Sequence, residues 1–210
     1  GINLEYFNLK NTSEKKVRSL ATTWNIDTNN FIILIPGRLT RWKGQEIFIE
    51  SLNLLLKENP KKNFHAIILG SNQGRHLYSK KLLLLVEQYR LRKKISFIEN
   101  CKEMPVAYKL ADVVVSSSIE PEAFGRVTVE AQAMSKPIVA SDIGGSRETI
   151  LNGKSGILYN SNDPKELAKA IGKIMNLDKD SLSLMGEAGR KNVEKKFNVD
   201  QMCQTTFTEY

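Results

Sequence analysis

Short runs of branched apolar residues alternate along this chain with longer segments in which apolar residues recur every three or four positions. The short runs are typical of buried parallel strands, and the longer segments are typical of amphipathic helices. The alternation predicts an α/β domain with a mostly parallel, Rossmann-like sheet flanked by helices on both faces. Six segments are expected to be strands: residues 31–35, 66–69, 95–98, 113–115, 137–140 and 157–159.

Helical periodicity is found in the segments between and after these strands. Helices are expected over residues 13–24, 46–57, 78–89, 106–110, 127–134, 165–175 and 181–196, with a short one starting near Ser146 and a weaker pattern over 199–210. In open parallel sheets, ligands bind beyond the carboxyl ends of the strands, where the strand order reverses. The loops that follow the strands are therefore the expected location of function.

Length and composition favour one large domain without metals or disulfides. A chain of 210 residues can bury a sizeable core by itself. Cys101, Cys203, His65 and His76 are isolated from one another in sequence, so no metal site is expected. Few cysteines, no signal peptide and no apolar stretch of membrane-spanning length predict a cytoplasmic protein. Gly1 in place of an initial Met predicts that the chain was cut from a longer one.

The formal net charge of the chain is +8. Three interpretations are open: a solvated Lys-rich surface, attraction to phosphate ligands, or attraction to an anionic membrane face. Nucleic acid is not an expected partner, because the basic residues are scattered and not interleaved with exposed aromatic ones.

The loop after the first expected strand carries two cations, Arg38 and Lys43, between Gly37 and Gly44. An Arg fork and a Lys point charge on one loop can clamp a diphosphate, and the glycines let the backbone bend closely around it. The order of these residues is neither that of a P-loop nor that of the dinucleotide-binding glycine motif. The alternative is that these charges are simply solvated.

The loop after the fourth expected strand leads directly into a helix, and Gly125 lies where that helix begins. The first amides of a helix have no partner within it, and the helix dipole favours negative charge there. The amides of Phe124, Gly125, Arg126 and Val127 are therefore a candidate site for phosphate or sugar hydroxyls.

Two carboxylates accompany this helix start. Glu130 lies in an otherwise apolar stretch, where its burial is costly unless something hydrogen-bonds to it. The hydroxyls of a bound ribose would do so; the alternative is a carboxylate that faces solvent. Glu122 lies eight residues earlier and can face the same cavity from the loop.

Two further segments are candidate walls of the pocket. Gly144 and Gly145 follow the fifth expected strand, permit a close backbone approach and can close the other side of the pocket. Ile98, at the end of the third expected strand, is the candidate for binding the flat edge of a base through its backbone.

Taken in order, these motifs resemble the retaining glycosyltransferases of family 4, which have the GT-B fold. Gly37-Arg38-Leu39 followed by Lys43-Gly44 resembles that family's phosphate loop, and Glu122-Ala123-Phe124-Gly125 with Glu130 resembles its motif of two spaced glutamates. The resemblance extends over nearly the whole chain, through Pro137-Ile138-Val139-Ala140-Ser141, Gly144-Gly145 with Glu148, Gly153-Lys154-Ser155-Gly156 and the opening Gly1-Ile2-Asn3-Leu4-Glu5-Tyr6-Phe7.

The resemblance implies that the chain is the C-terminal, donor-binding half of a GT-B enzyme. Residues 1–196 would be the Rossmann-like domain, with a linker remnant over 1–12, and residues 197–210 a helix that crosses to the missing N-terminal, acceptor-binding domain. The donor would be a UDP- or GDP-sugar, with no cofactor and no metal. The hexosyl group would be transferred with retention, in synthesis of bacterial cell-envelope polysaccharide or lipopolysaccharide. A lipid-linked acceptor or the inner face of the membrane would then be a partner of the full-length enzyme.

The resemblance also implies residue roles. Arg38 and Lys43 would neutralise the diphosphate, Glu130 would hold the ribose hydroxyls, and Glu122 would face the transferred sugar, which makes Glu122, Arg38 and Lys43 the expected catalytic residues. The amides from Ala123 to Val127 would hold sugar hydroxyls and phosphate. Retention by front-face attack, with the leaving phosphate as base, needs no carboxylate nucleophile.

Two other functions fit the same fold. One is a nucleotide-sugar epimerase, a class that lacks this pairing of a cationic loop with two spaced glutamates. The other is a nucleotide-sugar-binding module without transferase activity as an isolated domain.

Overall fold

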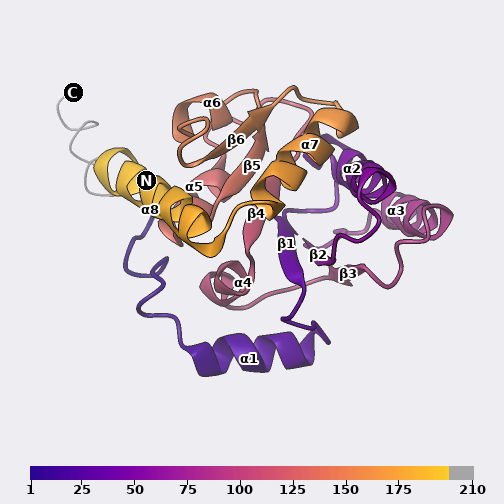
Figure 1. The fold of residues 1–210 in the computed structure, drawn as a ribbon, viewed down its shortest axis with the longest axis horizontal. Helices are drawn as coiled ribbons and strands as arrows, with labels where there is room; N and C mark the ends of the chain where they lie inside the picture. Colours follow the sequence, from indigo (N-terminus) through magenta and orange to yellow (C-terminus); the bar gives the residue numbers. More distant parts are fainter. Residues whose placement is uncertain (199–210) are drawn as a thin grey trace.

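The strands form one six-stranded parallel sheet in the order β3-β2-β1-β4-β5-β6 (Figure 1). The computed structural model describes residues 1–198. The strands are β1 (Phe31–Pro36), β2 (Phe64–Leu69), β3 (Ile95–Ile98), β4 (Val113–Ser116), β5 (Ile138–Ser141) and β6 (Gly156–Tyr159). All predicted strands are confirmed. The largest difference is in β2, where the polar His65 interrupts the apolar run and hides the true start at Phe64.

The helices follow the predicted segments closely. They are α1 (Glu14–Thr23), α2 (Gln45–Glu58), α3 (His76–Gln88), α4 (Met104–Leu110), α5 (Arg126–Ala133), α6 (Ser146–Thr149), α7 (Pro164–Met175) and α8 (Lys179–Lys196). The structure adds a short 3-10 helix, η1 (Arg41–Lys43), which the periodicity did not predict. The helix predicted over 199–210 lies outside the described residues. None of the described helices is long and apolar enough to cross a bilayer.

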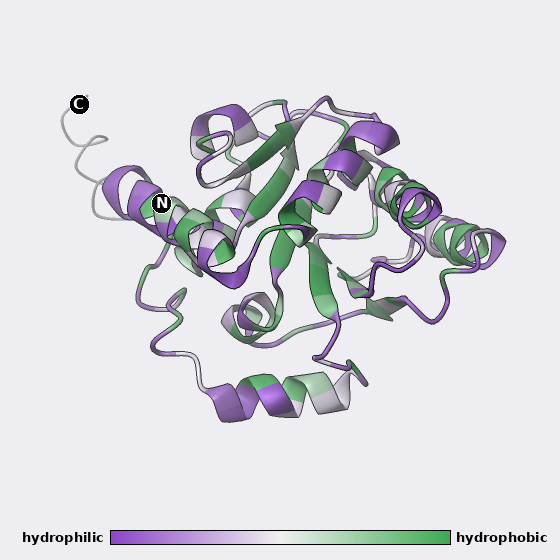
Figure 2. Cartoon of the chain, in the orientation of Figure 1, coloured by the Kyte–Doolittle hydropathy of each residue, from purple (hydrophilic) through white to green (hydrophobic). Residues whose placement is uncertain are grey.

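Two apolar cores lie on opposite faces of the sheet. In β1, Ile32 and Leu34 pack with residues of α1, α4, α5 and α8, whereas Ile33 and Ile35 pack with residues of α2, α3 and α7. Alternate residues of a strand point to opposite faces, so a strand covered by helices on both sides must be apolar throughout. Figure 2 shows this, with apolar strands at the centre and polar residues on the outward faces of the helices.

The strand order reverses between β1 and β4. From β1 the chain proceeds through β2 to β3 on one side, and from β4 through β5 to β6 on the other. β1 and β4 are themselves paired, with Ile33 opposite Val113 and Leu34 opposite Val114. The loops that leave their carboxyl ends therefore diverge from one point, which is where open α/β sheets bind ligands.

Candidate functional site

The loops after β1 and β4 are fastened to each other at this reversal point. Gly44, between η1 and α2, has a φ of 69°, and a Cβ there would lie 1.9 Å from the carbonyl oxygen of Ser117. The Ser117 hydroxyl donates to the carbonyl oxygens of Lys43 and Gly44 at 3.1 and 3.0 Å. The Ile119 amide donates to the carbonyl oxygen of Trp42 at 2.8 Å. This direct packing of backbone on backbone requires glycine at position 44.

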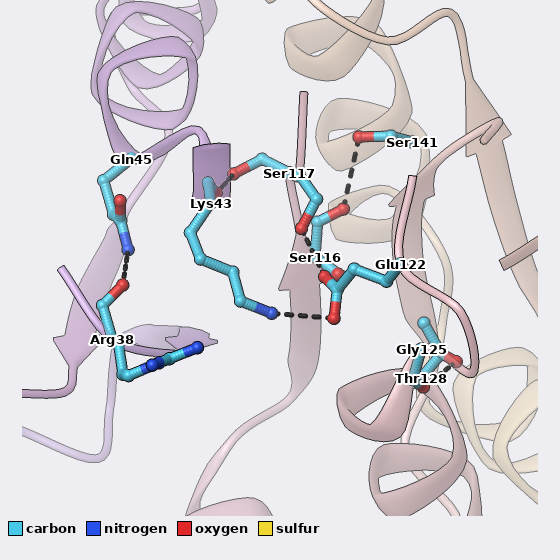
Figure 3. Close-up of polar contacts among 10 residues, drawn as sticks. Arg38, Lys43, Gln45, Ser116, Ser117, Glu122, Gly125, Thr128 and Ser141 are labelled. Atoms are coloured by element: carbon cyan, nitrogen blue, oxygen red, sulfur yellow. Dashed lines mark hydrogen bonds and ion pairs between the residues drawn. The ribbon is translucent and has the colours of Figure 1, made fainter. Parts of the chain in front are cut away.

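Lys43 and Glu122 form an ion pair between the two loops (Figure 3). The Lys43 Nζ lies 2.8 Å from the Glu122 Oε2, and the two side chains are only 13% and 18% exposed. The Lys43 ammonium also lies 4.4 Å from the centre of the Trp42 ring, and the Ser118 hydroxyl donates to the other oxygen of Glu122. The structure thus brings together two predicted site residues, although the sequence did not predict that they pair with each other.

Arg38 extends from the same loop toward the space beside Lys43 (Figure 3). The Arg38 carbonyl oxygen accepts from the side-chain Nε2 of the buried Gln45 at 2.9 Å. The Tyr78 hydroxyl donates to the Gln45 Oε1 at 3.2 Å. The Arg38 side chain is exposed, and it forms no ion pair within residues 1–198. The backbone of Arg38 is therefore fixed while its guanidinium is available to an anionic ligand.

The start of α5 lies beside this cationic pair. Gly125 precedes the helix with a φ of 67°, and among the described residues the amides of Arg126 and Val127 have no backbone acceptor. The Gly145 amide donates to the Glu122 carbonyl oxygen at 2.8 Å, and a Cβ on Gly144 would lie 2.5 Å from that same oxygen. The close backbone approach expected at the glycine pair is therefore made by the 122–125 loop.

Glu130 is buried, with 8% of its surface exposed, which excludes the solvent-facing alternative. Its Oε2 accepts from the Tyr108 hydroxyl at 2.8 Å, and its Oε1 accepts from the Arg126 Nε at 2.8 Å. The expected hydrogen bonds to this carboxylate are thus present and come from two protein side chains, while a contact with ribose hydroxyls stays a prediction. Arg126, itself 80% exposed at its side chain, is thus engaged with Glu130.

Tyr108 is the residue that the sequence analysis missed. It is fully buried in α4. Burial, and to a lesser extent the nearby Glu130 charge, raises the pKa of its phenol well above the usual value. The phenol therefore stays protonated and donates to the carboxylate. A signal was present in the sequence: a tyrosine that follows the apolar Val106 and Ala107 in a helix is expected to be buried and then needs a partner for its hydroxyl.

Tyr108→Phe is expected to lower the free energy of unfolding by roughly 1–3 kcal/mol, because the buried Glu130 loses one of its two donors. Urea denaturation measures this change. Tyr159→Phe is the matched control, since that buried phenol meets only the neutral Ser141 hydroxyl, at 3.1 Å. An equal or smaller loss in Tyr108→Phe would contradict the assigned positioning of Glu130.

A hollow of about 740 Å³ opens beside Glu130, between the N-terminal segment and the start of α5. Its lining residues are Gly1, Ile2, Asn3, Tyr6, Phe7, Met104, Phe124, Arg126 and Glu130. The predicted glutamate thus borders a cavity large enough for part of a small organic ligand.

Ile98 adjoins the loop after β1 through Gly70. It ends β3, the edge strand, and β2 and β1 lie between it and β4. Its carbonyl oxygen accepts from the Gly70 amide at 2.8 Å, and its side chain packs against the core. A Cβ on Gly70 would lie 2.0 Å from the Gly37 carbonyl oxygen, so only Gly70 separates Ile98 from the loop that carries Arg38. The expectation that Ile98 binds a base stays a prediction.

Known proteins are similar in sequence to this chain over most of its length. The chain is 31% identical over 186 residues to a D-inositol 3-phosphate glycosyltransferase of Corynebacterium jeikeium, covering 87% of this chain and 43% of that protein. It is 28% identical over 199 residues to the capsular polysaccharide biosynthesis glycosyltransferase CapM of Staphylococcus aureus, covering 94% and 49%. The chain therefore spans about half the length of these relatives.

Solved structures share the fold. A glycosyltransferase from Rickettsia africae matches with a TM-score of 0.94 and 31% identity, over 100% of this chain and 55% of that one. Anabaena Alr3699/HepE in complex with UDP matches with a TM-score of 0.87 and 27% identity, over 100% and 56%. The C-terminal domain of a group 1 glycosyl transferase, LpcC of Francisella tularensis, matches with a TM-score of 0.80 and 26% identity, over 95% and 100%.

The similarity to known proteins extends well beyond the loops at the reversal point. The family model for "Glycosyl transferases group 1" matches residues 18–192, which include every element from β1 to α7. The chain belongs to the group 1 glycosyl transferases.

Proposed function

We propose that the chain is the donor-binding domain of a retaining glycosyltransferase, which transfers a hexosyl group from a UDP- or GDP-sugar to an acceptor held by another domain. The observation that carries this proposal is the convergence of Arg38, Lys43 and the start of α5 at the reversal point between β1 and β4. Two cations and a set of unpaired helix amides are the groups that bind a diphosphate without a metal.

Each group has a distinct part in binding the donor. Arg38 and Lys43 bind the diphosphate, and the amides at the start of α5, with those of Ala123 and Phe124, bind phosphate and sugar hydroxyls. Glu130, held by Tyr108 and Arg126, presents its carboxylate to the ribose hydroxyls from the wall of the hollow. Glu122 faces the transferred sugar once the diphosphate has drawn Lys43 away from it.

The proposed transfer exchanges two bonds at the anomeric carbon. The bond to the leaving phosphate oxygen breaks while the acceptor oxygen attacks the same face, and the acceptor proton passes to that phosphate. Arg38 and Lys43 stabilise the negative charge that develops on the diphosphate, which is the principal work of the protein. Glu122 is not assigned as a nucleophile, since attack on the same face with the leaving phosphate as base needs none.

The similar proteins support a donor and an acceptor class. Alr3699/HepE has been solved with UDP and with UDP-glucose, which supports a UDP-sugar donor here. The similarity to CapM, a capsular polysaccharide biosynthesis glycosyltransferase, supports a place in bacterial cell-envelope polysaccharide synthesis. Residues 1–12 would serve as interdomain linker, residues 1–196 as the donor domain and residues 197–210 as a connection back to the acceptor domain, at the cytoplasmic side of the membrane.

Isothermal titration of the chain with UDP, GDP, UDP-glucose and a single-stranded oligonucleotide tests this function. We expect selective binding of a nucleoside diphosphate, unchanged between Mg²⁺ and a chelator, because the clamp consists of side chains and amides. Binding that requires Mg²⁺, or binding of the oligonucleotide in preference to every nucleotide, would contradict the proposal.

A further inference from the structure

Helix α3 turns an apolar stripe outward. Leu77 and Leu84, seven residues apart and so on one side of the helix, are 87% and 60% exposed. The opposite side carries Leu82 and Val86, which are buried against the sheet. No other helix within residues 1–198 exposes more than one large apolar side chain. In Figures 1 and 2, α3 lies at the right-hand margin of the molecule.

Basic side chains flank this stripe. Lys80 and Lys81 lie three and four residues from both leucines, so the four residues share one face of the helix. The acidic side chains on and beside α3 are already paired, Glu46 with Lys81 and Glu87 with Arg92. Lys80 is exposed and forms no ion pair within residues 1–198. The outward face of α3 is therefore apolar along its middle and positively charged at its edge.

A hollow of about 630 Å³ adjoins the start of α3 and extends the same surface. Trp42 and Tyr78 contribute aromatic side chains to it, Arg41 and Arg75 contribute exposed cations, and Leu77 lies at its border with the helix face. Aromatic residues with an apolar body and a polar edge, together with Arg and Lys, are the side chains enriched where proteins meet lipid headgroups.

We propose that the outward face of α3, with the hollow at its start, is a docking surface for the anionic face of a lipid bilayer. Leu77 and Leu84 enter the headgroup layer, while Lys80, Arg75 and Arg41 bind lipid phosphates. The combination of exposed leucines with the exposed cations Lys80, Arg75 and Arg41 fits this occupant, since a bilayer surface offers an apolar layer beneath a layer of phosphates. The helix face carries none of the residues proposed for donor binding, whereas the hollow at its start includes Trp42, whose ring lies 4.4 Å from the Lys43 ammonium. The inference itself requires no bound donor.

Co-sedimentation of the chain with vesicles of equal parts phosphatidylcholine and phosphatidylglycerol, compared with phosphatidylcholine alone, tests this surface. We expect binding to the anionic vesicles that weakens with added salt, and at least tenfold weaker binding for Leu77→Ser/Leu84→Ser. Lys80→Glu is expected to weaken binding about tenfold, through reversal of one charge. The matched controls on other faces are Leu184→Ser on α8, where the leucine is 66% exposed, and Lys173→Glu on α7, both expected to bind as the parent chain does.

Nucleotide titration of the same variants shows whether the donor site and the fold are intact, so a failure of membrane docking is distinguishable from a failure of donor binding. Equal sedimentation with both kinds of vesicle, or none with either, would overturn the proposal. So would equal losses in the control variants. Self-association that disappears in Leu77→Ser/Leu84→Ser, without vesicle binding by the parent chain, would assign the surface to a second copy of the chain instead.

Discussion

Gly44→Ala is expected to lower the free energy of unfolding by about 3 kcal/mol and to weaken nucleoside diphosphate binding. Two costs combine at this position. The φ of 69° is unfavourable for any residue with a Cβ, and that Cβ would meet the Ser117 carbonyl oxygen at 1.9 Å. Backbone atoms cannot rotate away as a side chain can, so the loop after β1 must separate from the loop after β4. Lys43 and Glu122, one on each loop, would then move apart.

Gly74→Ala is the matched control for this prediction. Gly74 has a φ of 82°, but a Cβ there would meet nothing within 4 Å. Gly74→Ala is therefore expected to lower the free energy of unfolding by the cost of the unfavourable φ alone, about 1 kcal/mol. Urea denaturation of both variants measures the difference, which reports the contact between the loops. Equal destabilisation by the two substitutions would mean that the loops can separate without cost.

Lys43→Ala is expected to weaken binding of UDP or GDP by about 1.5–3 kcal/mol, the scale of a charge-assisted contact, and Arg38→Ala by a similar amount. For Lys43 the loss has a second source. Without the ammonium, the Glu122 carboxylate that it held at 2.8 Å stays close to the incoming diphosphate and repels it. Lys43→Ala/Glu122→Gln is therefore expected to recover part of the affinity.

Calorimetric titration of these variants separates the two contributions. Arg41→Ala is the matched control, because it removes an exposed cation from the same segment without touching the Lys43–Glu122 pair. Unchanged affinity in both Lys43→Ala and Arg38→Ala would remove the diphosphate clamp from the mechanism. A double variant that binds more weakly than Lys43→Ala would show that Glu122 does not compete with the diphosphate.

The local sequence pattern was sufficient to predict the strands and helices, but insufficient to predict which side chains contact one another. The strands and long helices followed from periodicity, because a fully buried strand and an amphipathic helix impose different spacings on apolar residues. Lys43, Glu122 and Glu130 could be placed near one site, because their loops follow strands that are neighbours at the reversal point. Which atoms they bind depends on residues distant in sequence, such as Tyr108, and no spacing rule specifies that choice.

Two site expectations depend on how the elements are arranged. Ile98 was expected at the pocket because it ends a strand, and the structure shows that β2 and β1 lie between its strand and β4. Gly144 and Gly145 were expected to permit a close backbone approach, and the structure shows that the approaching segment is the backbone of Glu122. Long-range packing decides both arrangements, so the local pattern could not specify them.

Backbone hydrogen bonds join the loops after β1, β4 and β5 through Trp42, Ile119, Glu122 and Gly145. The walls of the site therefore exist before any ligand arrives, and little of the association free energy is lost to ordering them. Side chains that project from this scaffold can change during evolution without altering the path of the chain. A new sugar preference would thus need few substitutions and no rebuilding of the domain.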